Sequence, residues 1–170
     1  MSREEIKQDP SEMLIRVINS YLNEIYQASP PNINWKSYDN PIHIDFDIKG
    51  GSKRDIKLDM AKNYLIIYTT NHILKLENHD DKDRVLFFVA HINEGLSLTG
   101  LDFNVDSGEF RYKSGQSFPR NSDFSRVLRY FNELHDAHFD KLQESIINFL
   151  HQRTLDPLES AKAFLNKIKS

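Results

Sequence analysis

The chain has 170 residues, a length that suits one domain and suffices to close a hydrophobic core without disulfides or metals. Its formal charge is −3, and its lysines and arginines are scattered among acidic residues, which excludes the basic stripe of a nucleic-acid-binding protein. Cysteine is absent, which excludes disulfides, thiol nucleophiles and the usual structural zinc sites and is compatible with a reducing compartment.

Neither an export signal nor a membrane-spanning segment is visible in the sequence. The N-terminus is charged from Arg3 onward and lacks the continuous apolar core of a secretory signal. The longest apolar runs, such as VLFFVA, are far shorter than the roughly 20 residues that cross a bilayer. We therefore expect a cytoplasmic protein without a membrane partner.

Helical spacing marks the first predicted element. Apolar residues recur every three to four positions between Pro10 and Ile25, which predicts a helix with one buried stripe. The segment ASPPNINWKSYDNP, residues 28–41, ends this helix because its prolines and asparagines favour turns. Trp35 and Tyr38 are large aromatic residues in this polar loop. They are candidates for contact with a partner, and ordinary packing onto the core is the alternative.

Alternation with a period of two follows the loop. Apolar residues from Ile42 to Ile48 alternate with polar ones, and Gly50 and Gly51 then supply a turn. The same alternation continues as far as Met60, and the stretches NYLIIYTT and HILKL add one or two strand segments. The sequence thus predicts three or four antiparallel strands in this region.

A second helix and a hairpin occupy the middle of the chain. The aspartates of residues 78–83 suit a helix N-terminus, and Gly95 suits the end of the helix that follows. Two apolar-rich runs, 98–105 and 110–112, are separated by the turn residues Asp106, Ser107 and Gly108. Such a pattern predicts a β-hairpin.

The last third of the chain is predicted to be helical. An apolar stripe from Phe124 to Phe149, with Asn121 or Ser122 as its cap, predicts a helix longer than about 25 residues. Asp156, followed by a proline and by Glu159, marks the start of a short final helix. The predicted order is α-β-β-β-α-β-β-α-α. We expect a single α+β domain over residues 1–170, in which helices pack on an antiparallel sheet of about five strands.

Two groups of residues have the spacing of metal ligands. His43, Asp45 and Asp47 lie on one side of a predicted strand, although alternating polar residues are also typical of the solvent face of such a strand. His135 and His138 are one helical turn apart, although on a long helix such residues more often form its solvated flank or a dimer contact. We therefore assign no metal and no cofactor.

Motifs of catalysis and of nucleotide binding are missing from the sequence. Neither a Gly-x-Ser-x-Gly elbow, a Gly-x-x-x-x-Gly-Lys-Ser/Thr loop nor a Gly-x-Gly-x-x-Gly loop occurs. This predicts a protein that is not an enzyme.

The segment FFVAHINEGLSLTGLDFNVDSGEFRYKSGQSF, residues 87–118, resembles the central signature of the YbjN family of bacterial proteins. In that family a helix ending in Asn leads into a strand, an acidic-Gly turn and a strand with basic and aromatic residues. The matching positions here are Asn93, Gly100, Phe103, Gly108, Phe110, Arg111 and Tyr112. The resemblance covers about residues 8–150 as the family-like core, with residues 155–170 as a C-terminal helical extension.

The resemblance implies the fold of type III secretion chaperones, an α+β sandwich that is commonly dimeric and binds segments of other proteins. It implies no catalytic residue, and some members are described as sensory transduction regulators. Asn93, Glu94 and Arg111 are polar residues that neither a turn nor a strand requires, so we add them to Trp35 and Tyr38 as candidate binding residues.

The leading hypothesis is a non-enzymatic protein-binding module, chaperone-like or regulatory, that forms a homodimer and holds a protein partner. Two alternatives stay open. One is a small-molecule sensor with a pocket between the sheet and the long helix. The other is a metal-dependent protein that uses His43, Asp45 and Asp47.

Overall fold

The computed structural model of the chain describes residues 10–25, 33–37, 40–77, 81–118 and 124–169. In chain order the elements are α1 (Pro10–Ile25), β1 (Ile33–Ser37), β2 (Ile42–Ile48), the short 3-10 turn η1 (Lys49–Gly51), β3 (Ser52–Asp59), β4 (Tyr64–Lys75), α2 (Lys82–Gly95), β5 (Thr99–Phe103), β6 (Glu109–Ser117), α3 (Phe124–His151) and α4 (Pro157–Lys169). The α+β class is confirmed, with four helices packed on one antiparallel sheet of six strands. No helix in these ranges is long and apolar enough to cross a membrane.

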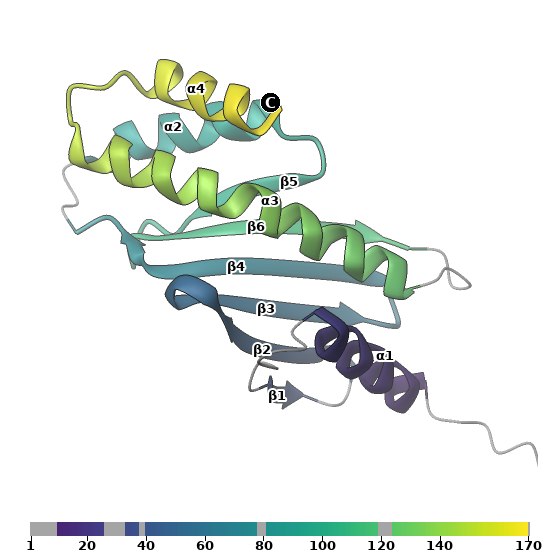
Figure 1. The fold of residues 1–170 in the computed structure, drawn as a ribbon. Coiled ribbons are helices and arrows are strands. Elements are labelled where there is room, and N and C mark those ends of the chain that lie inside the picture. Colours follow the sequence, from purple (N-terminus) through teal and green to yellow (C-terminus); the bar gives the residue numbers. More distant parts are fainter. Residues whose placement is uncertain (1–9, 26–32, 38–39, 78–80, 119–123, 170) are drawn as a thin grey trace, which may run out of the picture.

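The strands of the sheet lie in the order β1-β2-β3-β4-β6-β5. The first four form a meander in which each strand pairs antiparallel with the next. Strand β6 then lies between β4 and β5 and is antiparallel to both. Consequently β4 and β5 run parallel to each other, and α2 forms the crossover between them (Figure 1).

All four helices cover the same face of the sheet, and two clusters of apolar side chains lie beneath them. The first cluster joins α2, α4 and the C-terminal half of α3 to β5, β6 and the end of β4. The second joins α1 and the N-terminal half of α3 to β2, β3 and the start of β4. Helix α3, 28 residues long, spans both clusters, and it runs obliquely across the strands in Figure 1.

The prediction of about five strands was one strand too few. Strand β1 lies in the segment that was predicted to be a loop, and it pairs with β2 from Ile33 to Ser37. It is a five-residue strand at the sheet edge, and its register shifts between Trp35 and Ser37. A short edge strand with an irregularity, preceded by two prolines, gives little periodic signal.

The predicted helix ends are confirmed where the structure describes them, except that Asp81, the N-cap residue of α2, makes no capping hydrogen bond with its side chain. Helix α2 ends at Gly95, and α3 exceeds 25 residues. At the start of α4, Asp156 Oδ1 accepts a hydrogen bond from Glu159 N at 3.0 Å. Helix α4 also contributes the buried side chains of Ala161 and Phe164 to the first cluster. The expected C-terminal extension is therefore part of the core. The predicted caps Asn121 and Ser122 lie outside the described residues.

Candidate functional site

The face of the sheet opposite the helices is the candidate functional site, and we call it the open face. It carries the residues that alternate with the core positions of each strand, and in the described ranges no helix packs on it. In Figure 1 the helices α1 and α3 lie in front of the sheet, so the open face points away from the viewer. By alternation and register it includes Asn34, Lys36, His43, Asp45, Asp47, Lys53, Asp55, Lys57, Asp59, Tyr64, Ile66, Tyr68, Thr70, Gly100, Asp102, Glu109, Arg111, Lys113, Gly115 and Ser117.

Asp45 is a buried carboxylate on this face. Its Oδ2 lies 2.5 Å from Lys36 Nζ on β1 and 2.7 Å from Lys53 Nζ on β3. Burial tends to raise its pKa, but hydrogen bonds and charge from the two lysines outweigh burial and hold the pKa below its ordinary value. The two lysines thus cover Asp45 and neutralise it.

The strand group His43, Asp45 and Asp47 does not converge on a common point. His43 Nε2 lies 2.7 Å from Asp55 Oδ1 on the neighbouring strand, whereas Asp45 is bound by lysines. The described ranges contain no group of three or more His, Asp or Glu side chains that could hold a metal ion. The metal-dependent alternative gains no support from this arrangement.

Tyr68 lies on the inner strand β4 between two cations. The Lys57 ammonium lies 5.7 Å from the ring centroid of Tyr68, and the guanidinium carbon of Arg111 lies 5.8 Å from it. Both distances are those of cation–π contacts. The residues directly opposite Tyr68 on the adjacent strands are Asp55 and Lys113.

The four charged neighbours of Tyr68 differ in whether another described side chain binds them. Asp55 is bound to His43 as described, and Lys113 Nζ lies 2.6 Å from Asp102 Oδ1. Lys57 and Arg111 take part in no ion pair with another described residue. The Arg111 Nε atom is also buried without a hydrogen-bond partner. The centre of the open face therefore carries two uncompensated positive charges.

Tyr64, Ile66 and Tyr68 form a half-buried row along β4, which we call the aromatic row. The Tyr64 hydroxyl lies across Gly115 of β6, where an added Cβ would come within 2.7 Å of it. Glycine at this position leaves room for the hydroxyl end of the Tyr64 ring beside the neighbouring strand. The row presents aromatic and aliphatic surface in the middle of a charged face.

Two cavities hollow the open face near the turn that joins β2 and β3. One, of about 350 Å³, is lined by Asn34, Phe46 and Asp45 among others. The other, of about 270 Å³, reaches towards the end of β4. Both are lined by Asp47 and Lys53, so they adjoin each other.

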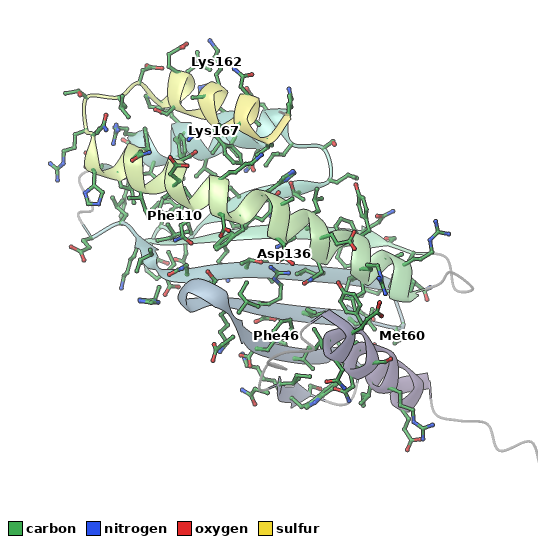
Figure 2. The ribbon with its side chains drawn as sticks, in the orientation of Figure 1. Phe46, Met60, Phe110, Asp136, Lys162 and Lys167 are labelled. Atoms are coloured by element: carbon green, nitrogen blue, oxygen red, sulfur yellow. The ribbon has the colours of Figure 1, made fainter. Side chains whose placement is uncertain are left out.

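His135 and His138 of α3 face the sheet, in a belt of buried polar groups between the two apolar clusters. In Figure 2 the labelled Asp136 lies between Phe110 of the first cluster and Phe46 of the second. His135 is fully buried, with Nδ1 2.7 Å from Thr69 Oγ1 and Nε2 2.9 Å from Ser114 Oγ. Burial, followed by the charge of Arg54, holds the pKa of His135 well below its ordinary value. His135 is therefore not on a solvated flank of α3, and both of its ring nitrogens have hydroxyl partners.

His138 has a separate partner in the same belt. Its Nδ1 lies 2.8 Å from the Tyr112 hydroxyl, which donates a hydrogen bond to Thr99 Oγ1 at 2.8 Å. Burial raises the pKa of Tyr112 to about 12 and lowers the pKa of His138, which the nearby Lys141 lowers further. Both groups are therefore neutral at pH 7, and they hold β5 and β6 against α3.

The candidate binding residues of the sequence are dispersed in the structure. Trp35 packs against the second apolar cluster, and Tyr38 lies outside the described residues. Asn93 donates to Leu101 O at 2.9 Å and accepts from Leu101 N at 2.7 Å, which fastens the connection between α2 and β5. Glu94 is exposed, and its Oε2 lies 3.3 Å from His91 Nδ1. Of the candidates that the structure describes, only Arg111 lies on the open face.

The aromatic row was not among the sites predicted from the sequence. The stretch YLIIY carries apolar or aromatic residues on both faces of the strand, so alternation does not tell which face is buried. Pairing resolves this, because Ile67 lies opposite the core residue Ile56, whereas Tyr68 lies opposite Asp55. A signal was nevertheless available, since Ile56 already alternates with charged residues along β3.

A further cavity, of about 370 Å³, lies between α3 and α4. Its lining includes Phe149 and Leu155 beside polar residues of both helices. The sensor alternative expected a pocket between the sheet and the long helix. That space contains the two apolar clusters and the polar belt between them.

Comparison of the chain with protein-family models, with curated proteins and with solved structures finds no match. The resemblance to the YbjN family, and with it the secretion-chaperone fold, therefore stays a prediction.

Proposed function

We propose that this protein is a non-enzymatic binding module that holds a segment of another protein against the open face of its sheet. The observation that supports the proposal is the aromatic row, with Tyr68 half-buried between the cations of Lys57 and Arg111. Aromatic residues and arginine are the side chains that contribute most to protein–protein binding. We further propose that the protein works in the cytoplasm.

The shape of the face suits an extended segment. A chain lying along β4 would contact Tyr64, Ile66 and Tyr68 in succession, since these residues point to the same side of the strand. The cavity of about 270 Å³, which Thr70 and Asn71 of β4 help to line, would accept a single side chain of that segment. Pockets that receive individual side chains are the usual source of specificity in peptide recognition.

The non-enzymatic part of the proposal is supported by how the histidines are used. His135 is fully buried and bonded to two hydroxyl groups, so a substrate has no access to it. His43 and His138 each have a neighbouring side chain as partner. These contacts are explained by the stability of the fold alone.

The test is a comparison of the proteins that bind the wild-type chain with those that bind a Tyr68→Ser variant. Tagged full-length proteins are incubated with native extract, and the bound proteins are quantified by mass spectrometry. Tyr130→Ser is the matched control, because Tyr130 is 48% exposed and lies on α3, on the other side of the sheet. We expect at least one protein whose recovery falls about tenfold or more in Tyr68→Ser and is unchanged in Tyr130→Ser.

Two outcomes would contradict the proposal. One is the absence of any protein recovered above background with the wild-type chain. The other is a set of bound proteins that responds equally to both substitutions, which would place the binding surface elsewhere. Circular dichroism of both variants shows whether each remains folded.

A further inference from the structure

We infer that the segment held by the open face is acidic, and that its carboxylates lie beside the Tyr68 ring, against Lys57 and Arg111. The inference rests on the proposed function and adds the chemistry of the partner to it. It starts from the two cations that face the same aromatic ring without a counter-charge in the described part of the chain.

Of the two cations, Arg111 gives the stronger support for an acidic segment. Its guanidinium makes no hydrogen bond with a described residue, and its Nε is buried without a partner. The two Nη groups of Arg111, unlike Nε, are not among the buried unsatisfied atoms, so their N–H donors are accessible to the oxygens of a bound carboxylate. Arginine also offers paired N–H groups that match the two oxygens of a carboxylate.

The charges of the whole face indicate where such a segment lies. Asp45 and Asp55 are bound by Lys36, Lys53 and His43, and Asp102 is bound by Lys113. Lys57 on β3 and Arg111 on β6 instead flank the Tyr68 ring without an ion-pair partner among the described residues. An acidic segment would therefore be attracted to the stretch of β4 between these two cations. The distribution thus favours one track across the face.

Nucleic acid, which is also an anionic chain, fits the same face less well. A phosphodiester backbone carries a charge at every nucleotide and needs a continuous row of cations. Here the carboxylate of Asp102 lies next to Lys113 and binds it at 2.6 Å. Two isolated cations beside an aromatic ring match spaced carboxylates and apolar side chains better than a uniformly charged chain.

The test uses synthetic peptides of alternating sequence. A glutamate–tyrosine peptide is compared with glutamine–tyrosine and lysine–tyrosine peptides of the same length, by isothermal titration calorimetry with the full chain at low and high salt. We expect the glutamate peptide to bind about tenfold more tightly than the glutamine peptide at low salt. The preference should shrink as salt screens the charges.

Substitutions that reverse the charge of Lys57 or Arg111 test the same inference from the side of the protein. Lys57→Glu and Arg111→Glu should each weaken the glutamate peptide by about tenfold and remove its advantage over the glutamine peptide. Lys62→Glu is the control, because Lys62 is 80% exposed and lies in the turn between β3 and β4. It should leave the binding unchanged. Equal affinity for the three peptides, or an equal effect of all three substitutions, would overturn the inference.

The remaining outcomes separate this inference from the proposed function. If Tyr68→Ser weakens all three peptides alike, the face binds segments and only the acidic preference is wrong. If Tyr68→Ser changes none of them although they bind, both proposals are overturned. Tighter binding of polyuridylate than of the glutamate peptide would replace the acidic segment by nucleic acid. A dimer that Tyr68→Ser dissociates, seen by sedimentation, would make a second copy of the chain the occupant and overturn the acidic segment.

Discussion

Arg54 and Asp136, 82 positions apart in the chain, are joined across the sheet–helix interface, where Arg54 Nη2 lies 2.9 Å from Asp136 Oδ1. The Arg54 side chain on β3 is fully buried, and Nη1 also donates to the side-chain oxygen of Asn132. This single guanidinium therefore ties the middle of α3 to the sheet at the boundary of the two apolar clusters.

Removing the carboxylate partner should destabilise the fold because it leaves a buried cation without a counter-charge. We expect Asp136→Ala to lower the free energy of unfolding by about 1–3 kcal/mol, less than for a fully buried pair, since Asp136 is 48% exposed. Combining it with Arg54→Met should restore part of that loss. Urea titrations measure the difference, with Asp140→Ala, an exposed position on the same helix, as control. Equal effects of Asp136→Ala and Asp140→Ala would contradict the prediction.

Stability should fall as the pH drops below about 6.5, because His135 is neutral in the folded state. Burial and Arg54 lower its folded-state pKa below the ordinary 6.5, so the unfolded chain takes up the proton first. The loss per pH unit in that range approaches about 1.4 kcal/mol for this group. Melting temperatures between pH 7.5 and pH 5 should fall less steeply in His135→Gln than in the wild type.

The exposed His151 supplies the control for the pH series. A His151→Gln variant should keep the wild-type slope. If His135→Gln and His151→Gln give the same pH dependence, the buried histidine is not its source. Because the readout is a slope, a general loss of stability in the variant does not affect the conclusion.

Two glycines with positive φ angles predict different costs of substitution. Gly108 (φ +73°) closes the β5–β6 turn against β4, and an added Cβ would lie 2.3 Å from the backbone oxygen of Leu76. Gly50 (φ +77°) has no atom within 4 Å of that position. Gly50→Ala should therefore cost only the strain of the left-handed backbone, about 1–2 kcal/mol. Gly108→Ala should cost roughly 2 kcal/mol more, since backbone must move. Equal losses in urea unfolding would disprove the steric contact.

Arg84 caps the C-terminus of α3 from a neighbouring helix. Its Nη2 donates to Phe149 O at 2.8 Å and to Gln152 O at 2.9 Å, and the guanidinium lies 3.8 Å from the Phe149 ring centroid. Arg84→Lys should lower the free energy of unfolding by about 1–2 kcal/mol, because one ammonium cannot reproduce the planar fork. Hydrogen exchange at residues 150–155 should accelerate at the same time.

Arg153→Lys is the matched control for the cap. The Arg153 side chain is 63% exposed, and its Nε lies 3.4 Å from Asp81 Oδ2, which makes an ordinary surface ion pair. Its substitution should change stability by less than about 0.5 kcal/mol. If the two substitutions have similar effects, the carbonyl contacts of Arg84 contribute little.

The sequence predicted those parts of the fold that depend on local periodicity. The apolar stripe of α3 and the cap at Asp156 are read within a few turns of helix, and both are confirmed. The spacing of this stripe also predicts that His135 is buried. It lies four positions after Phe131 and four before Phe139, and both of these are buried. The one-turn spacing of His135 and His138 instead indicated metal ligands, a solvated flank or a dimer contact.

The candidate site depends on pairings between distant strands, which local patterns do not contain. Lys57 and Arg111 approach the same ring only because β6 pairs with β4 although α2 and β5 intervene in the chain. Arg54 is a different case, because its alternation with Ile56 and Leu58 already places it on the core face. Its partners on α3 could not be read from the sequence, since nothing local sets the position of that helix on the sheet.

The place of β6 between β4 and β5 also bears on how the chain is made. In a nascent chain that still lacks residues 109–117, the outer backbone edge of β4 has no strand to pair with, because β6 is its partner on that side. The stretch YLIIY, apolar or aromatic on both faces, lies on that edge. Long apolar edge strands pair readily with strands of other chains. Aggregation is therefore the hazard of the incomplete chain, and β6 removes it by pairing with β4.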